Sequence, residues 1–137
     1  MIGISTKTIY AMAAIHQLGL LKENDRINIK ELALRANTPD KFLGQILLEL
    51  KKAKILTSTK GSNGGYALGK KLQDINLKEI ITILENNAFE EVCQTGNPTL
   101  KLFWEERQKS LMNVFDTPLS ELTYYQEKVN QSFNYII

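Results

Sequence analysis

The stretch that decides the fold runs from Lys60 to Gly69 and reads KGSNGGYALG. A lysine opens a glycine-rich turn, the segment from Tyr66 closes it, and residues 55–59 upstream read ILTST. Turn residues between two such segments predict a two-stranded hairpin with a basic tip, whose glycines let the backbone approach a ligand. The pattern also fits an ordinary surface hairpin, but directly after a pair of helices it predicts the wing of a winged helix-turn-helix.

Charge is divided unevenly along the chain. Residues 1–71 carry 12 Lys and Arg against 5 Asp and Glu, whereas residues 72–137 carry 5 against 10. The net charge of +2 therefore hides a basic half and an acidic half. A basic segment predicts binding to a polyanion with an affinity that falls as salt rises. Ribosomal and membrane-surface proteins share this charge pattern.

Length and composition exclude several classes of protein. The 137 residues, 43% of them hydrophobic, suffice for one modest core and an appended element. We expect a cytoplasmic protein with no membrane association, because no apolar run suits a transmembrane helix and the first residues lack the order of a signal peptide. One histidine, His16, and one cysteine, Cys93, form no catalytic set with the scattered carboxylates, so we expect no enzyme.

Helical periodicity dominates the amino-terminal half. The first segment is predicted to bury one stripe of a helix, formed by Ile9, Met12, Ala13, His16 and Leu20. On that stripe His16 is expected to be a packed, hydrogen-bonded core residue. Asn28 with Glu31 three residues later predicts the start of a second helix. Its expected buried face consists of Ile29, Leu32, Ala33 and Ala36.

Each of the three prolines follows a residue suited to helix N-capping, which predicts helices that begin at Pro39, Pro98 and Pro118. The helix from Pro39 to about Lys52 has an apolar stripe of Leu43, Ile46, Leu47 and Leu50. It follows the second helix after a short connection, as in a helix-turn-helix, so its amino-terminal turns are expected in the major groove. Lys41 and Gln45 share its exposed face and can reach the same base pairs.

Beyond the hairpin, Asn76 and Glu79 repeat the cap pattern before a stripe formed by Leu77, Ile80, Ile81 and Leu84. After a polar loop, the helix from Pro98 carries a broad apolar side formed by Leu100, Phe103, Trp104, Leu111, Val114 and Phe115. This side exceeds what a small domain can cover, so we expect it to join two copies of the chain. The alternative is packing against the amino-terminal domain. Residues from Pro118 predict a short helix packed alongside, with Leu119, Leu122, Tyr125 and Val129.

Several of these features together resemble the Rrf2 family of bacterial winged-helix regulators, which includes iron–sulfur, nitric-oxide-sensing and cysteine-metabolism regulators. The matching residues are Thr6-Lys7 and Tyr10, Phe42-Leu43 with Gln45, the hairpin from Lys60 to Gly69, Ile75-Asn76-Leu77 with Ile80, and Trp104. The resemblance implies a homodimer joined through the long helix. It also implies DNA contacts from the amino terminus, the start of the third helix and the wing. The residues expected at the DNA are Lys7, Tyr10, Thr38, Asp40, Lys41, Gln45, Lys60, Gly61, Ser62, Asn63, Gly64, Gly65 and Tyr66.

Some positions depart from the family pattern. Gly44 stands where many members carry a base-reading glutamate, Lys60 replaces the usual wing arginine, and Lys54 replaces the glycine that ends the third helix. Iron–sulfur members present three cysteines before the long helix, whereas this chain has Cys93 alone. We therefore expect no iron–sulfur cluster, no metal and no other cofactor. Cys93 is a candidate redox-sensing thiol or a cysteine without a present role.

The sequence thus predicts a mainly α protein: a winged helix-turn-helix with a two-stranded β wing and a long carboxy-terminal dimerisation helix. Residues 1–86 are expected to form the DNA-binding domain, and residues 87–137 the sensor-type loop, the long helix and the tail. The expected function is that of a homodimeric repressor on double-stranded DNA with a pseudo-palindromic operator, and its signal is unknown. The alternative is a winged-helix module that binds protein or RNA.

Overall fold

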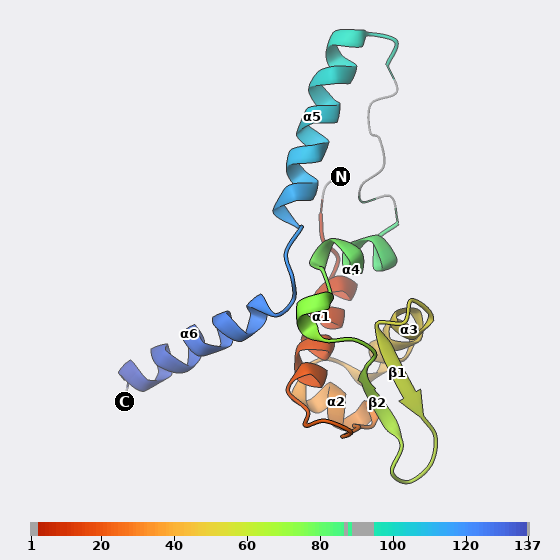
Figure 1. Ribbon diagram of the computed structural model, residues 1–137, viewed down its shortest axis with the longest axis vertical. Helices are drawn as coiled ribbons and strands as arrows, with labels where there is room; N and C mark the ends of the chain where they lie inside the picture. Colours follow the sequence, from red (N-terminus) through yellow and green to blue (C-terminus); the bar gives the residue numbers. More distant parts are fainter. Residues whose placement is uncertain (1–2, 87, 89–94, 137) are drawn as a thin grey trace.

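The computed structural model describes residues 3–86, 88 and 95–136 (Figure 1). Six α-helices, one 3-10 turn and a two-stranded antiparallel sheet are assigned within these residues, which confirms a mainly helical winged helix-turn-helix. Their bounds in chain order are α1 Thr6–Gly19, α2 Ile29–Arg35, α3 Asp40–Lys52, β1 Leu56–Thr59, β2 Gly65–Leu68, η1 Leu72–Asp74, α4 Leu77–Leu84, α5 Pro98–Val114 and α6 Glu121–Ile136.

The buried face of α1 differs from the predicted stripe. The helix buries Thr8, Ala11, Ala14, Ile15 and Leu18, whereas Ile9 and Leu20 are exposed. Apolar side chains lie on every side of this helix, so periodicity could not fix which side faces the core; packing against α2, α3, α4 and β2 did. His16 is half-buried, burial lowers its pKa, and its Nε2 has no hydrogen-bond partner among the described residues.

Helices α2 and α3 form the helix-turn-helix. The Asn28 side chain accepts a hydrogen bond of 2.9 Å from the Glu31 amide, as the cap pattern predicted. Helix α2 ends in a Schellman motif, in which Thr38 N–H donates to Ala33 and left-handed Asn37 donates to Leu34. Helix α3 buries its predicted stripe of Leu43, Ile46, Leu47 and Leu50.

The two ends of α3 differ in detail from the sequence prediction. Pro39 is the residue that flanks the helix rather than its first turn, and no side chain caps the amino end. At the other end Ile55 N–H donates to Leu50 and Lys54 N–H donates to Lys51, a second Schellman motif. Lys54 takes φ 65°, a left-handed conformation. That conformation is the one that glycine adopts most easily, and the resemblance implied a glycine at this position.

The wing pairs β1 with β2 in the register Leu56↔Leu68 to Thr59↔Gly65. Tyr66 continues the ladder on its other side, because its backbone exchanges hydrogen bonds of 2.8 and 3.1 Å with Ile27. Gly65 lies at this crossing with φ 144°, and a Cβ there would lie 2.5 Å from the Ile27 carbonyl oxygen. The glycine is therefore required both by its backbone angle and by the close approach of two strands.

The chain leaves the amino-terminal domain in α5 and then returns to it. Figure 1 shows α5 extending away from the other helices, with no buried residue along its length. The expected cap is present, since the Asn97 side chain accepts from the amides of Thr99 and Leu100. After α5, Leu119 N–H donates to the Ile75 carbonyl over 2.8 Å, and the Leu119 side chain is buried in the core.

The predicted helix from Pro118 is wrong in two respects. Pro118 forms a bridge to Asn76 instead of starting a helix, and α6 begins at Glu121. Helix α6 extends in a different direction from α5 rather than packing alongside it (Figure 1). Tyr125 and Val129 are consequently half-exposed. Backbone pairing with Asn76 governs this segment, and N-cap statistics cannot detect such a contact.

Candidate nucleic-acid interface

Four of the residues predicted to bind DNA meet where the amino-terminal end of α1 faces α3. Lys7 and Tyr10 from α1, and Lys41 and Gln45 from α3, line one hollow of about 660 Å³. Ser5, Thr6, Phe42 and Ile46 complete its lining. We call this feature the α1–α3 hollow. Two pairs of residues that lie 31 or more positions apart in the sequence thus converge on the exposed side of the predicted reading helix.

Phe42 forms the apolar part of this hollow. Its ring stacks against Tyr10 with centroids 6.3 Å apart, and the Lys41 ammonium lies 5.1 Å from its centroid. An exposed apolar surface beside a cation suits DNA, since a thymine methyl group can contact the ring while the lysine meets an acceptor. Sequence reasoning did not include Phe42 among the contact residues. The available signal was a large aromatic residue on an otherwise polar face, directly after Lys41.

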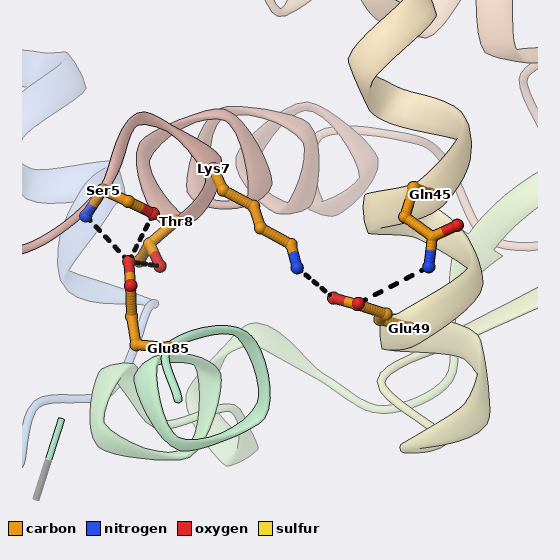
Figure 2. A network of polar contacts seen from close by, with 6 residues as sticks. All are labelled: Ser5, Lys7, Thr8, Gln45, Glu49 and Glu85. Atoms are coloured by element: carbon orange, nitrogen blue, oxygen red, sulfur yellow. Dashed lines mark hydrogen bonds and ion pairs between the residues drawn. The ribbon is translucent and has the colours of Figure 1, made fainter. Parts of the chain in front are cut away.

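Glu49 is the second residue that the sequence prediction did not place in the site. Figure 2 shows its carboxylate between Lys7 of α1 and Gln45 of α3. Glu49 Oε2 lies 2.8 Å from Lys7 Nζ, and Gln45 Nε2 donates to Glu49 Oε1 over 3.5 Å. One carboxylate therefore contacts two of the four residues that converge on the hollow.

A second carboxylate ties the same end of α1 to α4. Glu85 Oε1 accepts hydrogen bonds from Ser5 N–H, Ser5 Oγ and Thr8 Oγ1 over 2.6–2.7 Å (Figure 2). The negative charge also lies at the positive end of the α1 dipole. Burial raises the pKa of Glu85, but the hydrogen bonds from Ser5 and Thr8 outweigh it, with help from the Lys7 charge. The net pKa lies below its ordinary value of 4.5.

Glu85 should therefore make folding stability depend on pH. Because its pKa is lower in the folded chain, its stabilising contribution is present above pH 4.5 and is lost as pH falls through the folded-state pKa. Urea unfolding of wild type and Glu85→Gln should show a difference in unfolding free energy at about pH 7 that shrinks at about pH 3.5. Glu127→Gln, at an exposed position of α6, is the matched control. A difference that stays constant with pH would contradict this role.

The other predicted contacts lie outside the α1–α3 hollow. Thr38 and Asp40 line a second hollow of about 620 Å³, which shares Tyr10 with the first. In the wing, Lys60, Gly61, Ser62 and Asn63 form an exposed tip, and Gly64 and Gly65 are half-buried. Tyr66 packs partly against the core, which gives this residue a structural role in the hairpin.

The candidate sensor residue, Cys93, cannot be placed relative to this interface. Cys93 lies outside the described residues, as does most of the loop around it. Across the described ranges, no three His, Cys, Asp or Glu residues gather in a way that could hold a metal ion. One cysteine in the whole sequence does not fit the thiolate set of an iron–sulfur cluster. Among the helices that the structure describes, none combines the length and apolarity needed to cross a bilayer.

Comparisons with known proteins point to one family. A family model described as Rrf2, iron-dependent transcriptional regulator, matches residues 4–122. A putative HTH-type transcriptional regulator from Synechocystis is 27% identical over 98% of this chain and 99% of its own. Among solved structures, the global cysteine regulator CymR of B. subtilis has a TM-score of 0.78, with 28% identity over 91% of this chain and 98% of its own.

A second solved structure, the T. potens regulator IscR, has a TM-score of 0.75 and 27% identity over 93% of this chain and 90% of its own. The family model extends beyond the winged domain and through α5, to residue 122. These likenesses agree with the prediction that the chain is not an enzyme. The chain belongs to the Rrf2 family of winged helix-turn-helix, DNA-binding transcriptional regulators.

Proposed function

We propose that the protein is a cytoplasmic homodimeric repressor that binds a pseudo-palindromic operator in double-stranded DNA. The observation that carries this proposal is the convergence of Lys7, Tyr10, Lys41 and Gln45 on the α1–α3 hollow. Two cations, a phenol and an amide on one exposed surface supply the donors and acceptors that phosphates and base edges require. The basic charge of residues 1–71 favours the same partner.

The docking arrangement follows from helix geometry. The exposed side of α3 enters the major groove with its amino-terminal turns nearest the bases, where Gln45 reads a base pair. The wing tip with Lys60 meets the phosphate backbone or the adjacent minor groove. Gly44 leaves room on this helix, since the nearest atom to a Cβ there would be 3.9 Å away. A side chain can therefore begin at this position without a clash, so the absence of a glutamate bears on which bases can be read rather than on how α3 packs.

Dimerisation is proposed to use α5. The apolar residues Leu100, Phe103, Trp104 and Val114 are 47–67% exposed in the single chain, while Leu111 and Phe115 are partly buried. At 100° per residue, all six fall within an arc of about 120° around the helix axis. An exposed apolar arc of this width on a projecting helix favours a second copy of the same helix, and a two-fold dimer favours a two-fold operator.

Two substitutions separate base reading from backbone contact. Gln45→Ala should lower affinity for a specific duplex by about 1–3 kcal/mol and relax base preference at one position of each half-site. Lys60→Ala should weaken specific and non-specific binding together and reduce the salt slope by roughly one unit per contacting subunit. Titrations against the duplex footprinted in the gene's own upstream region, and against its scrambled version, at several salt concentrations measure both effects.

Each variant serves as the control for the other, because one removes an amide and the other a point charge. If Gln45→Ala leaves discrimination between the two duplexes unchanged, α3 is not the reading element. Equal binding of duplex DNA and RNA by the wild type would favour the alternative function, a module for RNA. We also propose that the repressor responds to its signal through oxidation of the Cys93 thiol rather than through an iron–sulfur cluster.

A further inference from the structure

Glu49 is an acidic residue in a surface that is proposed to meet a polyanion. Lys41, Gln45 and Glu49 are spaced four residues apart, so they share one face of α3. The Glu49 carboxylate lies between two helices, 2.8 Å from Lys7 Nζ on α1 and 3.5 Å from Gln45 Nε2 on its own helix (Figure 2). Both partners are residues of the α1–α3 hollow.

Fold stability does not account for this arrangement. The Lys7 and Glu49 side chains are 37% and 28% exposed, and ion pairs so open to water contribute little to stability because solvent screens them. A carboxylate on a phosphate-binding surface also repels every duplex, whatever its sequence. Glu49 therefore weakens general DNA binding and adds little to folding, so its effect must be sought in selectivity.

The contact with Gln45, at 3.5 Å a long hydrogen bond, favours one orientation of the amide. When one amide hydrogen of Gln45 points to Glu49, the second hydrogen and the carbonyl oxygen remain available. An N–H and a carbonyl oxygen side by side are the two groups with which glutamine reads adenine in the major groove. Holding the amide in one orientation before binding reduces the entropy that base reading costs.

The contact with Lys7 has the opposite effect on general affinity. A lysine paired with a carboxylate releases fewer counterions when a phosphate approaches than a free lysine does. Lys7 is therefore less available to an arbitrary duplex than its exposure suggests. Glu49 restrains the cation that would bind any sequence and orients the amide that distinguishes sequences.

We propose that Glu49 is a specificity-determining residue of this regulator: it orients Gln45 for base reading and restrains Lys7 from indiscriminate phosphate binding. The inference rests on the proposed DNA-binding function and names a residue that discriminates between duplexes without itself having to contact a base. When such a residue is removed, the protein should discriminate less between duplexes and should bind all duplexes more tightly. Neither the loss of a base contact nor the loss of a phosphate contact produces this combination.

The test uses two 20-base-pair probes: a duplex selected by the wild-type protein from a randomised library, and a scrambled duplex of the same composition. Glu49→Gln should bind the scrambled duplex about 3- to 10-fold more tightly, with a salt slope steeper by about two units per dimer, because two lysines are released. Its discrimination between the probes should fall by about fivefold or more. Glu31→Gln is the control, because it removes a carboxylate that pairs with Arg35 on α2, away from the hollow.

A second variant isolates the part played by Lys7. In a Lys7→Met background, Glu49→Gln should no longer steepen the salt slope, while the loss of discrimination through Gln45 should remain. Glu49→Gln with wild-type discrimination and slope would overturn the inference, and so would equal weakening of both probes. A wild-type protein that selects no duplex would overturn the proposed function itself, and the two failures are thus distinguishable.

Discussion

Trp104→Lys is expected to convert the proposed α5-linked dimer into monomers. Trp104 is 48% exposed on the apolar arc of α5 in the single chain, so its remaining surface is available to a partner. A charge buried without a partner costs about 3–5 kcal/mol, and each 1.4 kcal/mol is roughly a tenfold change in dissociation constant. The dissociation constant should therefore rise at least about a hundredfold, as measured by sedimentation at several protein concentrations.

Leu102→Lys is the matched control for this experiment. Leu102 is 59% exposed and lies on the opposite side of the same helix, where Glu105 and Glu106 can pair with the new charge. The control should remain dimeric and keep its helical content. A Trp104→Lys variant that is folded and still fully dimeric would show that α5 does not join the two chains through this arc.

Leu119→Ala should destabilise the winged domain by about 2–5 kcal/mol, the usual cost of removing a buried leucine side chain. Leu119 follows α5 in sequence but is only 2% exposed within the core that α1, α3 and α4 build. Urea unfolding at a fixed protein concentration measures the loss, because any contribution from dimerisation is then the same for both proteins compared.

Leu34→Ala supplies the reference for that measurement, because Leu34 is 76% exposed and surface substitutions change stability by less than about 0.5 kcal/mol. If both variants unfold alike, residues 116–122 do not fold with the amino-terminal domain. The division of the chain into residues 1–86 and 87–137 stays a prediction, and this experiment bears on it directly.

Local signals were reliable where one side of an element is apolar and the other polar. The stripe from Leu43 to Leu50 was predicted correctly because most of the remaining surface of α3 is polar or charged, with Phe42 and Leu48 as its exposed apolar residues. The wing was predictable for a different reason: Gly65 must tolerate both a positive φ and a neighbouring backbone, and few residues can do so. The asparagine caps at Asn28 and Asn97 depend only on atoms within three residues.

The candidate site was predictable only in part. Lys41 and Gln45 could be paired from their spacing of four on one helix. Lys7 and Tyr10 came from the family resemblance, because no periodicity links α1 to α3 across more than thirty residues. Glu49 shares the face of Gln45 by its spacing of four, but its contact with Lys7 depends on how two helices cross.

Residues close together along the chain were enough to predict the helix-turn-helix, the wing and the apolar arc of α5. Packing between elements fixes which side of α1 is buried, returns Leu119 to the core, and brings Glu49 and Glu85 to the same end of α1. The physical reason is the range of the interactions. Caps, turns and helical stripes are set by neighbours within a few residues, whereas burial and ion pairing between elements depend on their arrangement in space.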